Sequence, residues 1–300
     1  SLIIFFKFQI KEINPNKNIY LISKEMAILV NNWFMMYFLS VVLIGTTYPI
    51  ILEVITNDKI SVGPPFYNKL IIPFLIPFLV FMAIGPNLNW VKHNVKKIKI
   101  TQFIFLLISL LITYLIASKS SMQNLFLSIL VIGALYLVLN TLRDFILKKY
   151  NFSQKISHFG FSLFIISIIF NSLFSNEYSA NMKIGEKIKI DNIVMSLNNV
   201  STFNDKNYKS IIANFEIIKN QKDKVLLYPE IRIYNQPNIL TSEADIKTSI
   251  FSDKFIVMNL IKGEEYFNVR YQEKPFMIWI WISILILIFG GSLSFARKLK

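Results

Sequence analysis

The chain has 300 residues, of which 54% are hydrophobic, and its mean hydropathy is +0.49. Such values exclude an ordinary soluble domain and predict a membrane protein. The sequence contains no cysteine, which excludes disulfides and thiolate metal sites, and its formal net charge of +14 would favour nucleic-acid binding only if the basic residues gathered on one surface.

Six apolar runs are long enough to cross a bilayer as helices, because a core of about 30 Å needs about 20 helical residues. They cover residues 27–52, 70–86, 102–118, 123–142, 156–174 and 276–296. The sequence also begins with an apolar stretch, residues 1–6, which we interpret as the end of a further span. On this interpretation the chain is the C-terminal part of a longer protein.

The basic residues follow the expected membrane topology. Short loops on one side of the spans hold only Lys59, Lys69 and Lys119. The loops and ends on the other side hold fifteen, namely Lys7, Lys11, Lys17, Lys24, Lys92, Lys96, Lys97, Lys99, Arg143, Lys148, Lys149, Lys155, Arg297, Lys298 and Lys300. The positive-inside rule places the second side and the C-terminus in the cytoplasm, so we expect membrane lipid rather than nucleic acid as the partner of these charges.

The first four spans carry few chemical signals. Ser23 is a plausible N-cap of the first, and residues 56–69 combine Gly63 and two prolines with aromatic residues, which predicts a stiff interfacial turn or a rigid lip over a pocket. Pro73 and Pro77 predict a kink or a loosened helix in the second span. The third and fourth spans read as a scaffolding helical hairpin.

The fifth span contains His158 near its cytoplasmic end. An ionisable residue inside a membrane helix is a functional hypothesis by default, and Gly160 could leave room for a flat macrocycle, so His158 could ligate a haem iron. The residues alone favour an interfacial role, with bonding to Ser162, a headgroup or a carbonyl, and a proton relay is a third reading. His93 lies among lysines in a cytoplasmic loop and is expected to be solvated.

Within residues 176–274, four stretches alternate apolar and polar side chains, namely "KIGEKIKIDNIVMSL", "SIIANFEIIKN", "KVLLYPEIRIY" and "KFIVMNLIKGEEYFNVRY". This alternation predicts antiparallel strands in a small sandwich or barrel. Glu230 and Arg232 lie two apart and therefore on one strand face. We predict three domains: a helical region over 1–175, an external β-rich domain over 176–274, and a last span with a basic tail over 275–300. No Walker loop, nucleotide-binding glycine motif or zinc-protease motif occurs in the sequence.

Several stretches, taken together, resemble a known family. These are "GTTYPIILE", "KISVGPPFYN", "KISHFGFSLFIISI", "YPEIRIYNQPNILTSEADIKT" and "KPFMIWIWISILILIFGGSLS". In this order they resemble the C-terminal half of CcmF, the large-subunit family of cytochrome c maturation haem lyases. The resemblance covers nearly the whole chain.

The resemblance implies a polytopic α-helical inner-membrane protein with a periplasmic β domain, which takes haem from a haem chaperone and attaches it to apocytochrome c. It implies a structural haem b with two membrane histidines as axial ligands, and the "SHFG" position gives His158 one of these roles. The second ligand and the substrate-haem site belong to the family's other half, so no catalytic residue is expected here. Other maturation subunits and a quinol donor are the further implied partners.

Two alternative functions belong to classes other than a haem lyase. In the first, the chain is a non-catalytic assembly scaffold whose β domain docks partner subunits. In the second, it is a permease component whose external domain captures a solute, although the spans have very few charged residues.

Overall fold

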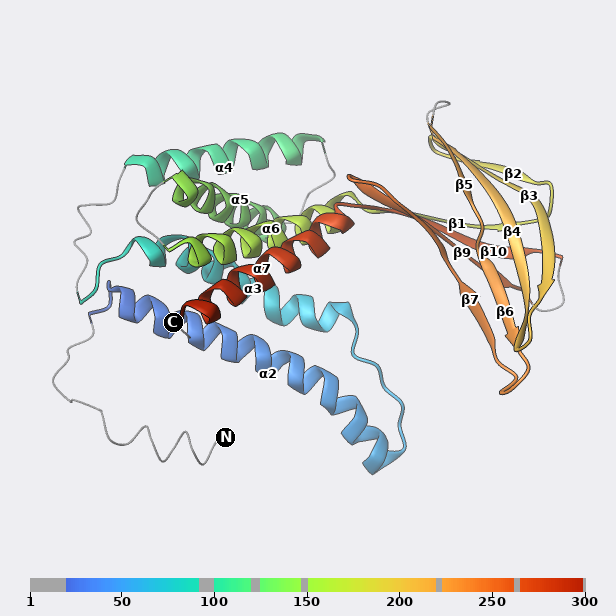
Figure 1. Ribbon diagram of the computed structural model, residues 1–300, viewed down its shortest axis with the longest axis horizontal. Helices are drawn as coiled ribbons and strands as arrows, with labels where there is room; N and C mark the ends of the chain where they lie inside the picture. Colours follow the sequence, from blue (N-terminus) through green and yellow to red (C-terminus); the bar gives the residue numbers. More distant parts are fainter. Residues whose placement is uncertain are drawn as a thin grey trace. The chain divides into compact units, whose positions relative to one another are not determined.

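The computed structural model describes residues 20–91, 100–119, 125–146, 151–219, 223–261 and 265–298 (Figure 1). The apolar stretch 1–6 and His93, both singled out in the sequence, lie outside these residues. The chain divides into two compact units, Ser1–Tyr150 and Asn151–Lys300. The division into three domains expected from the sequence stays a prediction.

All six predicted spans are helices long and apolar enough to cross a membrane. They are α2 (Lys24–Thr56), α3 (Pro64–Ile84), α4 (Ile100–Lys119), α5 (Leu125–Ile146), α6 (Phe152–Phe174) and α7 (Met277–Lys298), and the short 3-10 helix η1 (Gly85–Asn87) follows α3. The predicted fold class, a polytopic helical membrane protein with an inserted antiparallel β domain, is confirmed.

The beginning of α2 has the predicted cap. The backbone nitrogen of Met26 donates to Ser23 Oγ over 3.1 Å, which satisfies one of the amide groups left free at a helix start. The helix ends at Thr56, and its C-cap residue Asn57 has a left-handed φ of 61°.

The stretch predicted as an interfacial turn, residues 56–69, is irregular only over residues 57–63. Gly63 caps α3, and Pro64 and Pro65 occupy its first positions, where a fixed φ and a missing N–H are tolerated. The following Phe66 and Tyr67 pack over Gly45 of α2, where an added Cβ would lie 2.7 Å from the Tyr67 hydroxyl oxygen. The helix continues through Pro73 and Pro77.

Within the first unit, α5 contacts both α3 and α4, and α2 contacts α3. In the most apolar 18-residue segment of each helix, 44% of α5 is buried, against 11% of α2 and 11% of α4. Leu79 of α3 and Val131, Ala134 and Leu137 of α5 are fully buried at the centre of this packing.

The described residues between α6 and α7 form ten strands. Those of the smaller sheet are β1 (Asn176–Met182), β8 (Asp245–Thr248), β9 (Ser252–Leu260) and β10 (Phe267–Pro275), in the order β1-β10-β9-β8. Those of the larger sheet are β2 (Lys187–Ile190), β3 (Ile193–Asn204), β4 (Tyr208–Lys219), β5 (Asp223–Leu227), β6 (Glu230–Tyr234) and β7 (Leu240–Glu243). Its order is β2-β3-β4-β6-β7, and β5 also pairs with β4.

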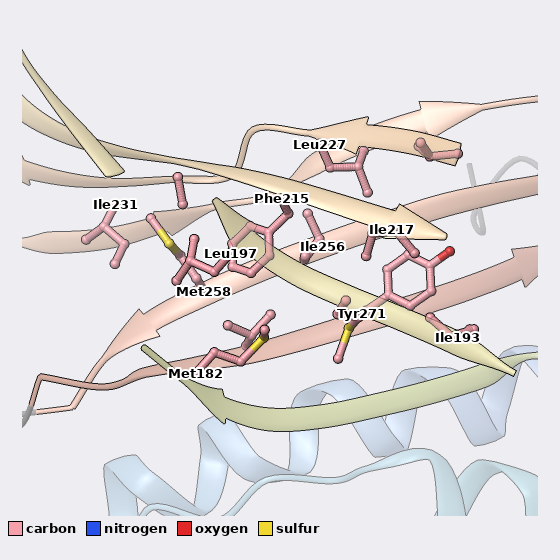
Figure 2. Packing of buried hydrophobic residues seen from close by; sticks show 14 residues of the cluster. Met182, Ile193, Leu197, Phe215, Ile217, Leu227, Ile231, Ile256, Met258 and Tyr271 are labelled. Carbon is pink, nitrogen blue, oxygen red and sulfur yellow. The ribbon is translucent and has the colours of Figure 1, made fainter. Parts of the chain in front are cut away.

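All strand pairs are antiparallel, and the apolar side chains of the two sheets form one core, drawn in Figure 2. Phe215, Ile231, Met258 and Tyr271 are among its fully buried members. The "YPE" stretch is a break rather than one strand: the Pro229 carbonyl accepts from the Ala213 nitrogen over 3.0 Å, between β5 and β6.

Candidate functional site

His158 lies in the second turn of α6 and is half-buried. It is the one histidine within the described part of the chain, and that part contains no group of three His, Cys, Asp or Glu side chains that could hold a metal. The donor set therefore consists of one imidazole, which fits one side of a haem iron with two axial histidines.

The nearby Gly160 has a role different from the one expected. A Cβ added there would lie 2.9 Å from Ile286 Cγ2 and 3.1 Å from the Leu287 backbone nitrogen, so α7 occupies the space beside it. On the facing helix, a Cβ at Gly290 would lie 2.9 Å from the Ser157 nitrogen. The expectation that Gly160 makes room for a macrocycle is wrong, because its missing side chain allows α6 and α7 to approach closely.

The contacts with α7 also fix the direction of the histidine. Successive helical residues are turned by about 100°, so His158 lies about 150° from the average direction of the α7-facing residues Ile156, Ser157 and Gly160. It shares its face with Ser162 and Ile165, which are both buried. The imidazole is thus presented on the side of α6 that α7 does not cover.

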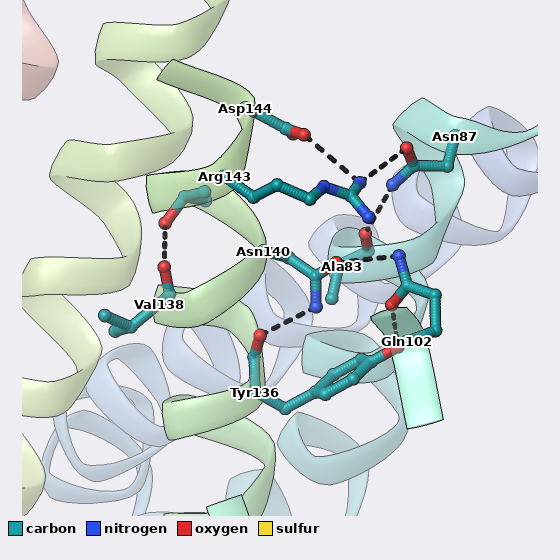
Figure 3. Close-up of polar contacts among 9 residues, drawn as sticks. Ala83, Asn87, Gln102, Tyr136, Val138, Asn140, Arg143 and Asp144 are labelled. Atoms are coloured by element: carbon teal, nitrogen blue, oxygen red, sulfur yellow. Dashed lines mark hydrogen bonds and ion pairs between the residues drawn. The ribbon is translucent and has the colours of Figure 1, made fainter. Parts of the chain in front are cut away.

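A second polar cluster occupies the first unit, in spans that the sequence suggested were only scaffold (Figure 3). Tyr136 donates through its hydroxyl to Gln102 Oε1, and Gln102 Nε2 donates to Asn140 Oδ1 over 2.9 Å. The Asn140 amide in turn donates to the Tyr136 carbonyl over 2.8 Å. These bonds join α4 to α5 through side-chain amides and a hydroxyl, which commonly link membrane helices.

The same face of α5 continues into an arginine. Arg143 donates to Asn87 Oδ1 over 2.8 Å and lies 3.3 Å from Asp144 Oδ1, with both charged side chains largely buried. It connects the end of α5 to η1. The signal for this cluster is the spacing of Tyr136, Asn140 and Arg143 by four and then three residues, which places them on one helix face.

The described part of the β domain contains five pairs of opposite charges, and in two of them, Glu230–Arg232 and Glu273–Lys219, both side chains are less than one third exposed. Arg232 Nε donates to Glu230 Oε1 over 3.0 Å on β6, as the predicted shared face requires, and the carboxylate raises the pKa of Arg232. Lys219 pairs with Glu273, and the Tyr271 hydroxyl donates to Glu273 Oε1 over 3.0 Å. Burial, and then the neighbouring Glu273, raise the pKa of Tyr271 well above its ordinary value.

The β domain and the chain as a whole are similar in sequence to known proteins. Residues 173–275 match the family model described as the CcmF C-terminal β-sandwich. The cytochrome c-type biogenesis protein CcmF of Escherichia coli (strain K12) is 30% identical over 284 residues, which cover 90% of this chain and 43% of that protein. The chain belongs to the CcmF family. The CcmF of Haemophilus influenzae is 25% identical over 312 residues, which cover 98% of this chain and 48% of the relative.

A solved structure named "Cytochrome c Heme Lyase CcmF" has the same fold, with a TM-score of 0.69 over 90% of this chain and 45% of that one, at 20% identity. The chain thus spans a little less than half the length of the CcmF proteins it matches. The resemblance found in the sequence is confirmed. The chain is a multi-pass membrane protein whose β-sandwich matches the model of the CcmF family.

Proposed function

We propose that this chain is the C-terminal part of a haem lyase that attaches haem to apocytochrome c, and that His158 supplies one axial ligand of a haem b held in the membrane. The observation that carries the proposal is a half-buried imidazole inside a membrane span, on the face of α6 that α7 leaves uncovered. The solved structure with the same fold is named a haem lyase, and this name supports haem as the bound group.

The residues around His158 suit the role of a ligand support. Neutral imidazole is a common axial ligand of haem iron, and a bound haem b would supply one-electron redox chemistry. The close contact of α6 with α7 at Gly160 and Gly290 holds the turn from which His158 projects. The second imidazole would come from outside the described residues.

We further propose that the chain sits in the bacterial inner membrane with its β domain in the periplasm and its C-terminus in the cytoplasm. The unequal distribution of lysine and arginine between the two sets of loops supports this orientation. The β domain would then lie on the side where a haem chaperone, apocytochrome c and other maturation subunits meet. A quinol is the proposed electron donor.

The test replaces His158 in the intact protein. His158→Ala should abolish, or lower at least about tenfold, the reduced b-type absorption bands of the purified protein, because a haem that loses one of its axial ligands is held weakly. His93→Ala is the matched control, since it removes the chain's other histidine, and it should leave the bands unchanged. Undiminished bands in His158→Ala protein that is as stable as the wild type would refute the ligand role.

A second role, docking of partner subunits, is favoured by the Glu230–Arg232 pair, which remains partly exposed on the larger sheet. Removal of residues 176–274 in the intact protein separates the two roles. Retained haem with lost association of the other maturation subunits supports docking by the β domain. Retained association would show that these subunits bind the helices instead.

A further inference from the structure

A basic cleft lies at the edge of the β-sandwich, between β5 of the larger sheet and the β8–β9 hairpin of the smaller one. Its volume is about 520 Å³. The polar residues that line it include Asp223, Lys224, Lys247, Ser249, Ser252 and Lys254. This site is separate from His158 and from the proposed haem chemistry.

Two of these lysines oppose each other directly. Lys247 of β8 and Lys254 of β9 are cross-strand partners, so their side chains project from the same face of the sheet. Neither forms an ion pair with any residue in the described ranges. Glu273 is the partner of Lys254 on its other side, but its carboxylate is bonded to Lys219 and Tyr271. Like charges placed opposite each other destabilise a sheet unless an anion lies between them.

The other charges of the cleft do not cancel this excess. Lys224 is already paired with Glu216, at 3.0 Å, and Asp223 is the one acid among the described residues that line the cleft. The lysines at 247 and 254 therefore give the cleft a positive charge that a phosphate would complement, since lysine binds phosphate as a compact point charge.

The cleft lies next to the start of a membrane span. Trp279 Nε1 donates to the Ile250 carbonyl over 2.9 Å, and the Phe276 nitrogen donates to the Phe251 carbonyl over 2.9 Å. Both bonds fasten the β8–β9 turn to the beginning of α7. Ile250 and Phe251 at this turn are 62% and 69% exposed, which is unusual for large apolar side chains in water and usual at a bilayer surface.

We infer that this cleft binds the headgroup of an anionic phospholipid at the membrane face from which α7 starts. Lys247 and Lys254 contact the phosphate, and Ile250 and Phe251 reach the acyl chains. A soluble anion would use the lysines alone, whereas a lipid uses the apolar turn as well. The combination of cationic and apolar groups beside a span therefore favours the lipid.

The test measures lipid binding to the full chain in detergent by native mass spectrometry. Phosphatidylglycerol should bind more tightly than phosphatidylcholine with the same acyl chains. The double variant K247Q/K254Q should lower the affinity for phosphatidylglycerol about tenfold, because each lysine near the headgroup contributes to the attraction. The matched control K206Q/K209Q removes two exposed lysines at the β3–β4 turn and should change the affinity less than about twofold.

The variant I250S/F251S distinguishes a lipid from a soluble anion. Weaker binding of phosphatidylglycerol by this variant supports a lipid site. An unchanged affinity, with the lipid displaced by inorganic phosphate or by polyglutamate, would overturn the inference in favour of a soluble anion. Equal binding of the two lipids, or equal effects of the two lysine variants, would also overturn it. Unchanged amide exchange in β4 shows that each variant is folded.

Discussion

The β domain and the membrane spans bury their apolar side chains by different means. The two sheets enclose a common core whose larger members, such as Phe215 and Tyr271, are fully buried by the domain's own strands. By contrast, in each of α2, α4 and α7 only 11% of the most apolar 18-residue segment is buried within the chain. The β domain is therefore stabilised mainly by removing apolar surface from water, whereas the spans depend on lipid and on close helix contacts.

A small change of side-chain volume therefore matters at different kinds of position in the two regions. In the sandwich, loss of a large side chain leaves a cavity, because the core is closed. In the helix pair α6–α7, the sensitive positions are those with no side chain at all, Gly160 and Gly290, because the two backbones meet there. A substitution in the sandwich should therefore destabilise it by leaving a cavity, whereas one in the helix pair should do so by forcing the two backbones apart.

The largest effect is expected for Phe215→Ala in β4. Phe215 is fully buried between the sheets, so its loss should destabilise the β domain by about 3–5 kcal/mol. Amide hydrogen exchange of the β3 and β4 peptides in the intact chain measures this. The control Phe203→Ala removes a ring that is 58% exposed on the neighbouring strand and should cost less than about 0.5 kcal/mol. Equal exchange in both variants would show that the sandwich does not depend on this core.

The sequence predicts the strands in which apolar and polar residues alternate, but it does not predict the polar strands at the edges of the two sheets. The stretches that became β3, β4, β9 and β10 alternate apolar and polar residues, and the structure confirms them as strands. The strands β1, β7 and β8 were missed because sequences such as "LTSE" and "DIKT" show no apolar alternation. All three are edge strands, whose pairing depends on a partner strand rather than on their own composition.

The residues of the candidate site were likewise only partly predictable from the sequence. His158 could be found because an ionisable residue is rare in a span. The Gln102–Tyr136–Asn140 cluster was missed because its partners come from different helices, and local sequence does not reveal which side chains meet. The role of Gly160 was misread for the same reason, since the group that fills the space beside it belongs to α7.

A smaller effect is expected for Glu273→Gln, which breaks the pair with Lys219. Glu273 is buried and also accepts from Tyr271, but Lys219 keeps access to water. The β domain should therefore lose about 2 kcal/mol, less than the 3–5 kcal/mol expected for a wholly buried pair. The control Glu177→Gln affects the exposed pair with Arg270, at 3.8 Å, and should cost less than about 1 kcal/mol. Exchange rates in β10 measure both, and a larger cost for Glu177→Gln would contradict the ranking.

The helix pair is tested by Gly290→Ala. The new Cβ would lie 2.9 Å from the Ser157 nitrogen, so α6 and α7 must separate at a cost of about 1–3 kcal/mol. The adjacent Gly291→Ala is an unusually close control, because nothing lies within 4 Å of its added Cβ. The thermal unfolding midpoint in detergent should fall for the first variant and not for the second. Equal midpoints would mean that the helices do not meet at this glycine.

The smallest stability effect is expected for Glu230→Gln on the larger sheet. Glu230 and Arg232 share one strand face and are both partly exposed, and such a pair contributes less than about 1 kcal/mol because water competes for both charges. Amide exchange of β6 should therefore hardly change. Association with other maturation subunits, measured by co-purification, should nevertheless weaken if this pair belongs to a docking surface, because charges at an interface select partners more than they stabilise a fold. Unchanged association in a stable Glu230→Gln protein would exclude Glu230 from that surface and leave it a minor surface contact of the sandwich.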